Sequence, residues 1–146
     1  MLKGVPAILS PQLMNVLMTM GHGDEIVLAD GNFPSVSTNP GCVYISGHQM
    51  LPVLDAVTRF LPLDEAVEEN VFLMDAPEGL KPEELWKRYE KVLRKNDAVF
   101  TRFTFIEKQK FYERAKKAYA VVSTGETTRF GNIILRKGIV RPDQLI

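Results

Sequence analysis

The stretch Gly21-His22-Gly23-Asp24-Glu25-Ile26-Val27-Leu28-Ala29-Asp30 decides the fold, because it places an apolar run between two polar ends. The run from Ile26 to Ala29 predicts a buried strand. Before it, an imidazole lies between two glycines, and after it comes the carboxylate of Asp30. Histidine exchanges protons near neutral pH, and glycine allows a sharp turn and the close approach of another molecule. On spacing alone, a helix-ending glycine beside an ordinary surface histidine fits equally well.

A helix precedes this strand, and further helices and strands alternate after it. Ser10 is a suitable N-cap residue and Pro11 a suitable first helical residue, and apolar side chains then recur at helical spacing until Gly21. The expected helices cover residues 11–20, 52–60, 82–95 and 108–119; the expected strands cover 26–29, 42–45, 71–74, 99–105, 120–123 and 133–135; a turn is expected at 31–34 and loops at 35–41 and 124–129. This alternation predicts a layered α/β fold. The chain contains no repeat, linker or low-complexity tract, so we expect a single domain over residues 1–146.

Composition restricts the partners and the compartment. Lysine plus arginine and aspartate plus glutamate number 18 each, so the net charge is zero and nucleic acid is disfavoured. Cys42 is the only cysteine, which fits a reducing cytosol, and its apolar strand suggests a small buried side chain. The N-terminus has no signal-peptide pattern, and no apolar run approaches the ~18–20 residues that span a bilayer. We expect a cytoplasmic protein that binds neither nucleic acid nor a membrane.

Motifs for several kinds of chemistry are missing. The chain has no glycine-rich nucleotide loop, no Gly-x-Ser-x-Gly elbow and no cysteine pair for zinc. His22 and His48 are the only histidines, and their spacing to Asp24 or Asp30 matches no helical or hairpin set of metal ligands. What remains is His22, several carboxylates and polar side chains in turns. This inventory suits proton transfer on a small polar substrate without a metal or other cofactor.

Several motifs, taken in order, resemble the fucose mutarotase and ribose pyranase family over residues 1–140. They are Gly21–Glu25, the turn Asp30-x-x-Phe33-Pro34, Phe111–Ala115, and Thr124–Glu126 leading to Gly131–Gly138. The forms Gly-His-Gly-Asp-Glu and Phe-Tyr-Glu-Arg-Ala are similar to the fucose branch. The resemblance implies a ribose-pyranase-like fold, with a mixed sheet flanked by helices. It also implies a homo-oligomer in which five subunits form a ring. Two such rings often stack as a decamer, and the active sites lie between neighbouring subunits.

The same resemblance implies a cofactor-free isomerase that interconverts the α and β anomers of a free sugar, most specifically L-fucose. Such a reaction needs a base to take the proton of the anomeric hydroxyl and an acid to protonate the ring oxygen. By resemblance, His22 is the proton donor. The residues that bind the sugar are, by resemblance, Asp30, Lys108, Phe130, Gly131 and Asn132.

Two of these positions depart from the family pattern. Phe130 stands where the family usually has tyrosine, so a phenol hydroxyl is missing. Lys108 stands where the fucose branch typically has arginine, so the positive charge is kept but the planar guanidinium, which can donate two parallel hydrogen bonds, is lost. A solvated lysine at the start of a helix fits this position equally well. Tyr112 and Tyr119 are candidates for the missing hydroxyl, although both lie on an apolar stripe that is expected to pack in the core.

The remaining candidates have structural interpretations beside the functional ones. Asp24 is placed to orient the His22 imidazole, but it also fits a surface carboxylate in a turn. Trp86 suits stacking on a sugar face, but its helical position favours the core or a subunit contact. His48 is expected on the surface of a turn. Two other functions stay open: a pyranase or mutarotase for ribose or another aldose, and a non-catalytic sugar-binding ring protein, which the missing phenol at Phe130 favours.

Overall fold

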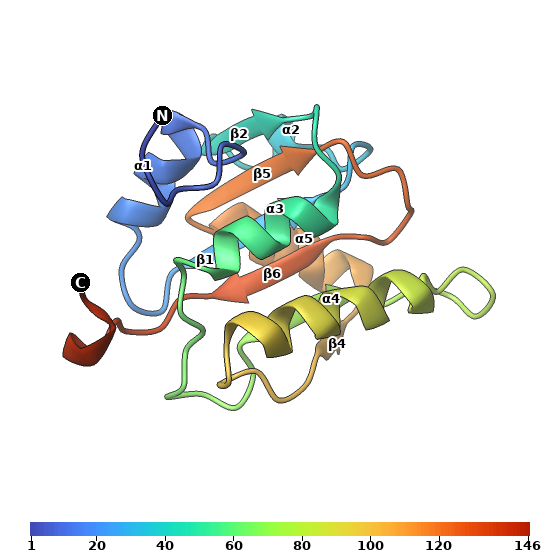
Figure 1. The fold of residues 1–146 in the computed structure, drawn as a ribbon. Coiled ribbons are helices and arrows are strands. Elements are labelled where there is room, and N and C mark those ends of the chain that lie inside the picture. The colour runs from blue at the N-terminus through green and yellow to red at the C-terminus, as the bar shows by residue number, and fades with distance from the viewer.

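The computed structural model describes residues 1–146, and in it six strands form one sheet between two layers of helices (Figure 1). The strands are β1 (Glu25–Ala29), β2 (Cys42–Ile45), β3 (Val71–Met74), β4 (Thr104–Ile106), β5 (Ala120–Thr124) and β6 (Ile133–Arg136). The helices are α1 (Pro11–Thr19), α2 (Ser35–Thr38), α3 (Met50–Thr58), α4 (Glu83–Asn96) and α5 (Lys108–Lys117), and a 3-10 turn, η1, covers Pro142–Gln144. The predicted α/β fold with a mixed sheet is confirmed.

The direction of the strands determines where polar residues gather. The sheet has the order β2-β5-β1-β6-β3-β4. Only β6 runs antiparallel to its neighbours, β1 and β3, while the other pairs are parallel. Five strands therefore end at one edge of the sheet, which we call the carboxyl edge, and β6 starts there. At the opposite edge, the amino edge, those five strands start and β6 ends.

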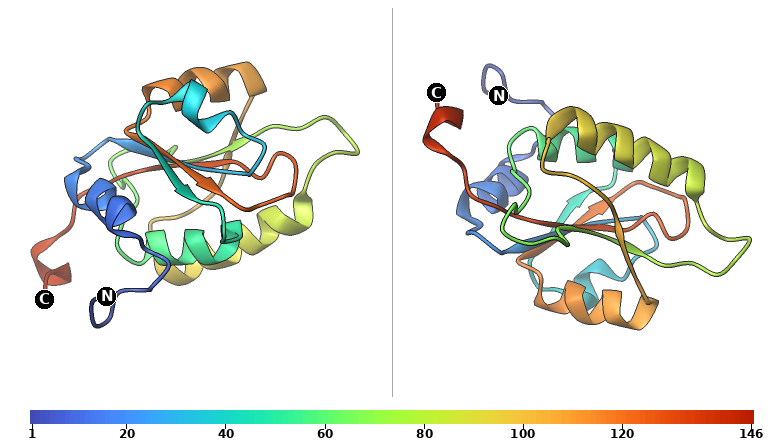
Figure 2. Two further views of the ribbon diagram at one scale, coloured as in Figure 1. Left: turned by 90° about the horizontal axis from the view of Figure 1, so that it is seen from above. Right: turned by 90° about the horizontal axis from the view of Figure 1, so that it is seen from below.

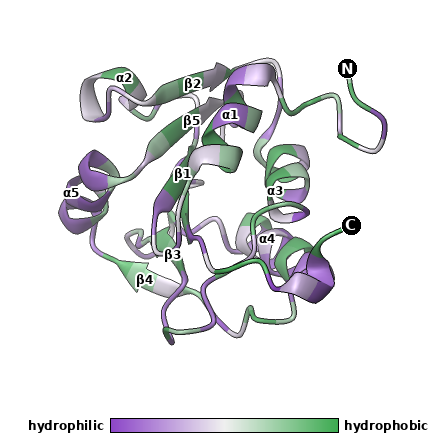
Figure 3. Cartoon of the chain, turned by 90° about the vertical axis from the view of Figure 1, so that its left-hand side faces the viewer, coloured by the Kyte–Doolittle hydropathy of each residue, from purple (hydrophilic) through white to green (hydrophobic).

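Both faces of the sheet are covered. Helices α1, α3 and α4 lie on one face, and α2 and α5 on the other (Figure 2). The residues of β1 alternate between two cores: Ile26 and Leu28 belong to the larger core beside α1, α3 and α4, while Val27 and Ala29 belong to the smaller core beneath α5. This burial on both sides explains why β1 is apolar from Ile26 to Ala29. The outer face of α5 is hydrophilic (Figure 3).

Several local predictions are confirmed. The Ser10 hydroxyl accepts a hydrogen bond from the Leu13 N–H at 3.2 Å, and Pro11 is the first residue of α1. Trp86 is buried on α4, with its ring centroid 5.0 Å from that of Phe105, so it packs in the core. His48 is exposed. None of the helices combines the length and apolar character needed to cross a membrane.

Other predicted elements were wrong in detail. Within the predicted loop 35–41, Ser35–Thr38 form a single helical turn, α2; its serine and threonine content is more typical of loops. In place of the predicted strand 99–105 the chain forms the shorter edge strand β4, because residues 97–100 form a turn in which the Phe100 N–H donates to the Asp97 carbonyl. Helix α3 begins and ends before its predicted bounds.

Cys42, Tyr112 and Tyr119 were predicted to be buried, and none of them is fully buried. Cys42 is half-buried, because β2 is an edge strand. Tyr119 is 41% exposed, because α5 ends at Lys117 and leaves this residue beyond the apolar face of the helix. The Tyr119 hydroxyl instead donates a hydrogen bond to the Thr19 hydroxyl at 2.8 Å.

Candidate functional site

The predicted site residues lie in two clusters at opposite edges of the sheet. His22 precedes β1 at the amino edge, and Asp30 follows β1 at the carboxyl edge. The second cluster, the Asp30 cluster, also contains the segment Phe130–Asn132, which leads into β6. A five-residue strand with about 3.3 Å per residue is about 16 Å long. This separation is longer than a monosaccharide ring, so one sugar cannot contact both clusters of a single chain.

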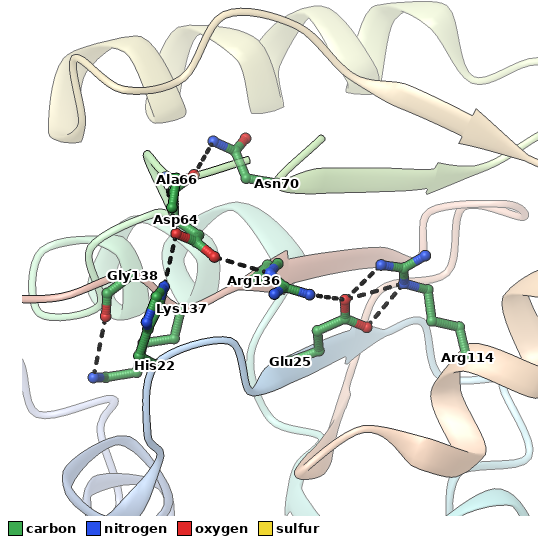
Figure 4. A network of polar contacts seen from close by, with 9 residues as sticks. All are labelled: His22, Glu25, Asp64, Ala66, Asn70, Arg114, Arg136, Lys137 and Gly138. Carbon is green, nitrogen blue, oxygen red and sulfur yellow. Dashed lines mark hydrogen bonds and ion pairs between the residues drawn. The ribbon is translucent and has the colours of Figure 1, made fainter. Parts of the chain in front are cut away.

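At the amino edge, His22 forms a pair with Asp64, whose carboxylate lies between His22 and Arg136 (Figure 4). His22 Nε2 lies 3.0 Å from Asp64 Oδ1, and Arg136 Nε donates to Oδ2 at 2.9 Å. The Ala66 N–H also donates to Oδ1. Burial alone would raise the pKa of the Asp64 carboxyl, but the hydrogen bonds from Arg136, His22 and Ala66 outweigh it and hold the pKa below its usual value.

The ionised state of Asp64 determines which imidazole nitrogen can exchange protons. A carboxylate only accepts hydrogen bonds, so Nε2 of His22 carries the hydrogen of this bond. Nδ1 is then the nitrogen left for a substrate. The imidazole is 51% exposed while the Asp64 carboxylate is only 2% exposed. A buried acceptor thus holds one nitrogen of a ring whose remainder faces outward.

Of the two interpretations of Asp24, the structure confirms the carboxylate in a turn and not the residue that orients the imidazole. Asp24 Oδ2 accepts a hydrogen bond from the Gly21 N–H at 2.7 Å and so closes the turn around His22. The orienting carboxylate, Asp64, is 42 positions from His22 and was missed. Sequence patterns give no signal for it, because the contact exists only after the segment before β3 lies beside the end of β6.

At the carboxyl edge, Asp30 and Asn132 are joined across β1 and β6. The Asp30 N–H donates to Asn132 Oδ1 at 2.8 Å, and the Asn32 N–H donates to Asp30 Oδ1 at 2.9 Å. Both Asp30 and Asn132 are buried. Burial raises the pKa of Asp30 above its ordinary value, despite hydrogen bonds from Asn32, Asn132 and Phe33. A buried carboxylate whose desolvation is only partly offset by hydrogen bonds is a strong acceptor for sugar hydroxyls.

The segment that carries Phe130–Asn132 is fixed from beneath by buried polar groups. The Tyr89 hydroxyl donates to the Gly131 carbonyl at 2.7 Å, and the Tyr89 side chain is fully buried. Glu126 Oε1 accepts from the Thr128 N–H at 2.9 Å, and the Glu126 carbonyl accepts from the Gly31 N–H at 2.8 Å. The loop between β5 and β6 is therefore held to α4 and to the end of β1.

Phe130 has the only positive φ among the non-glycine residues, at 59°. Left-handed backbone is costly for a bulky residue, and such strain concentrates at functional sites. Phe130 is half-buried and packs against both cores, which holds its ring in place. Position 130, where the resemblance leads one to expect a tyrosine, thus carries an apolar side chain that is held in place.

Of the two tyrosines predicted as substitutes for that phenol, the structure brings only Tyr112 to the Asp30 cluster. The Tyr112 ring stacks on Phe33 with centroids 5.2 Å apart, and burial together with the charge of Asp30 raises the pKa of its phenol. The Lys108 ammonium lies 6.0 Å from the centre of the same ring, and Lys108 is otherwise exposed. Tyr119 belongs to the amino edge, where its N–H donates to the Glu25 carbonyl.

Two hollows on the surface of the chain lie away from both clusters. One surface hollow lies between the ends of α3 and α4 and the C-terminal segment, and another lies beside the start of α4, and neither is lined by His22 or Asp30. No three histidine, cysteine or acidic side chains come together in an arrangement that could hold a metal ion. The chemistry available to these clusters is proton transfer by His22 and hydrogen bonding by the Asp30 cluster.

Comparison with known proteins gives a consistent assignment. Residues 3–140 match the RbsD / FucU transport protein family, and the chain belongs to this family. It is 47% identical to the fucose mutarotase of Homo sapiens, over 99% of this chain and 98% of that protein. The crystal structure of the fucose mutarotase from Streptococcus pneumoniae in complex with L-fucose has a TM-score of 0.89 at 40% identity, covering 96% of this chain and 100% of that one. The structure of Bacillus subtilis RbsD complexed with D-ribose, at 21% identity and a TM-score of 0.77, shares the fold; it covers 97% of this chain and 100% of that one.

Proposed function

We propose that this protein is a cofactor-independent L-fucose mutarotase. The observation that carries the proposal is the near full-length similarity to the Streptococcus pneumoniae fucose mutarotase, which was crystallised with L-fucose. The His22–Asp64 pair supports it, because an exposed imidazole with one nitrogen held by a buried carboxylate is suited to donate and accept protons.

In the proposed reaction His22 is the proton-transfer residue. Its protonated imidazole gives the Nδ1 proton to the ring oxygen while a water molecule takes the proton of the anomeric hydroxyl, and the C1–O5 bond breaks to give the open aldehyde. Rotation about the C1–C2 bond and reversal of these steps close the ring with the other configuration. General acid–base catalysis contributes about 10²–10⁴-fold. Because the uncatalysed reaction already proceeds in water, this contribution suffices.

The Asp30 cluster would hold the sugar. The Asp30 carboxylate accepts hydrogen bonds from hydroxyls, and the Asn132 amide and Gly131 backbone offer further polar groups, while Phe130 presents an apolar ring to the methyl group of a 6-deoxy sugar. Lys108 would add a donor at the rim. The Tyr112 phenol lies near Asp30, and we propose that its hydroxyl replaces the one that a tyrosine at position 130 would supply.

A complete site would require a second copy of the chain. The two clusters lie at opposite ends of β1, so a sugar on the Asp30 cluster of one copy would meet the His22 of a neighbour. A pentameric ring, alone or stacked as a decamer, satisfies this head-to-tail requirement because such contacts close into rings. Exposed apolar side chains of α1, α2 and β2 offer surface for the contacts; they are Met18, Val36 and Tyr44. A cytoplasmic location agrees with a single, unpaired cysteine.

Saturation-transfer NMR on the anomeric protons of L-fucose tests the activity, with D-ribose and D-galactose as parallel samples. Saturation should pass between the α and β signals faster than in protein-free buffer, and fastest for L-fucose. His22→Ala should abolish the gain while His48→Ala, which changes an exposed histidine outside both clusters, should retain it. Unchanged exchange in His22→Ala would exclude the mechanism. Faster exchange with D-ribose would favour a pyranase.

Mixing two inactive variants tests the shared site. Chains with His22→Ala and chains with Asp30→Asn each lack one half of every site. In rings reassembled from equal amounts of both, about a quarter of the sites combine an intact His22 with an intact Asp30 cluster. Recovery of about a quarter of the wild-type activity supports sites between copies, whereas no recovery indicates that both clusters act within one chain.

A non-catalytic sugar-binding ring is the second candidate, because Phe130 lacks the hydroxyl of the family pattern. This alternative predicts saturable binding of L-fucose without faster anomer exchange. The same NMR experiment separates the two candidates, since binding broadens the sugar signals whether or not saturation passes between them.

A further inference from the structure

The His22–Asp64 pair is one end of a longer chain of alternating charges (Figure 4). Beyond Asp64 come Arg136 on β6, Glu25 on β1 and Arg114 on α5. The Arg114 guanidinium donates three hydrogen bonds to the Glu25 carboxylate, at 2.6, 2.9 and 3.1 Å. Glu25 Oε1 also lies 4.0 Å from Arg136 Nη1. Four segments that are distant in sequence thus meet beside His22.

The burial of this chain makes its charges interact strongly. The Asp64 and Glu25 side chains are 2% and 12% exposed, and both arginines are about one-third exposed. Charges that are shielded from water interact more strongly than exposed pairs and are screened less by salt. With neutral His22, the two arginines balance the two carboxylates. A proton on His22 therefore adds an uncompensated positive charge next to Asp64.

We propose that Arg136 is a positioning residue that sets the pH at which His22 exchanges its proton. Its guanidinium holds Asp64 Oδ2, which turns Oδ1 toward the imidazole and fixes the ring. Its charge also offsets that of Asp64, so that Asp64 does not hold the proton on His22 too firmly. This inference rests on the proposed role of His22 as the proton-transfer residue.

The glycine after His22 supports this role for Arg136. Gly23 has φ 84°, and a Cβ atom built on it would lie 3.2 Å from Arg136 Nη2. The Gly23 N–H donates to the Lys137 carbonyl, and the Lys137 N–H donates to the Asp24 carbonyl, which ties the turn around His22 to the end of β6. The second glycine of the motif thus leaves room for the guanidinium beside the histidine.

The other charged groups near His22 are engaged elsewhere. Asp24 accepts from the Gly21 N–H, and the Lys137 ammonium lies 3.5 Å from the Gly138 carbonyl. Glu65, next to Asp64 in sequence, is 3.5 Å from Arg141. Asp64 is the carboxylate that contacts the imidazole, so Arg136 and, through it, Glu25 and Arg114 are the groups positioned to tune it.

NMR titration of the His22 Cε1 proton tests the proposal without relying on activity. In Arg136→Met, Asp64 faces His22 unopposed, so the midpoint of the His22 titration should rise by about one pH unit. In Glu25→Gln, Arg136 loses its counter-charge, so the midpoint should fall. Arg136→Lys should lie closer to the wild type than Arg136→Met. The matched control is Arg102→Met, which breaks an exposed ion pair with Glu68 and should leave the midpoint unchanged.

The two substitutions with opposite expected signs keep the test decisive if one variant folds poorly. A lower melting temperature with an unmoved midpoint in folded Arg136→Met and Glu25→Gln would show a purely structural role and overturn the proposal. If the wild type fails to accelerate anomer exchange, the proposed function fails, but the titration still reports on Arg136. If the wild type is active, the pH profile of exchange should move with the His22 midpoint.

Discussion

The hydroxyl of Tyr89 offers a direct test of how the sugar-binding loop is held. Tyr89 on α4 is fully buried, and its hydroxyl donates to the Gly131 carbonyl at 2.7 Å. Tyr89→Phe keeps the ring and removes only this donor, leaving a buried carbonyl short of a partner. Loss of one partner of a buried hydrogen bond costs about 1–3 kcal/mol. We expect the free energy of unfolding to fall by that amount.

Urea unfolding at fixed protein concentration measures this loss. With a slope of about 1–3 kcal/mol/M, a loss of ~2 kcal/mol lowers the midpoint by about 1 M. Tyr119→Phe is the matched control, because its hydroxyl bonds to Thr19 at the exposed surface and its removal should cost no more than about 0.5 kcal/mol. Fixed concentration is essential, since the stability of an oligomer depends on it.

The same variant should weaken sugar binding. Gly131 lies between Phe130 and Asn132, so a loosened carbonyl displaces both neighbours, and KM for L-fucose should rise while the His22 titration stays unchanged. If Tyr89→Phe unfolds at the same urea concentration as Tyr119→Phe, the Tyr89 hydroxyl does not hold the loop that carries Gly131, and the Asp30 cluster is fixed by other contacts.

Further expectations concern single residues. Gly23→Ala should lose about 1–2 kcal/mol of stability in urea unfolding, because of its positive φ and the Arg136 guanidinium, whereas Gly47→Ala, with open space around it, should change stability little. Burial raises the pKa of Asp30, so its favourable contribution to stability is lost as pH rises through the folded-state pKa. Asp30→Asn should therefore raise the melting temperature at pH 7 while L-fucose binding falls, and a lower melting temperature would contradict this sign. The pKa of Asp64 is held below its ordinary value, so its contribution is present at neutral pH and lost on acidification below about pH 4, a loss that Asp64→Asn should lessen in acid unfolding curves. Phe130→Tyr restores the family hydroxyl and should raise kcat in the exchange assay with stability unchanged within about 0.5 kcal/mol.

Local features of the fold could be predicted because they depend on neighbouring residues. The cap at Ser10 and the apolar run of β1 are set by spacing alone, and the structure confirms them. The end of α5 could not be predicted in this way. Tyr112 and Tyr119 are seven residues apart, which is about two helical turns and places them on one face. The helix stops at Lys117, so only Tyr112 stays on the side of the Asp30 cluster.

The site could be predicted only in part, for the same reason. A resemblance indicated His22, Asp30 and the segment before β6, and these assignments stay predictions. Asp64 and Tyr89 have no local pattern, since each acts through a contact 42 positions away in sequence. Such contacts depend on the order of the strands, because the antiparallel β6 follows directly after Asn132 at the carboxyl edge and ends with Arg136 at the amino edge.

The placement of the two clusters at opposite ends of β1 has a consequence for how such a protein is used. If each active site needs the His22 end of β1 from one copy and the Asp30 end from another, an isolated chain is inactive. The activity per chain then rises with protein concentration. Specific activity then declines on dilution in proportion to the assembled fraction, and sugar that bridges two copies favours their association. A cell that contains little of the chain would have less than proportional activity, and modest overproduction would switch it on.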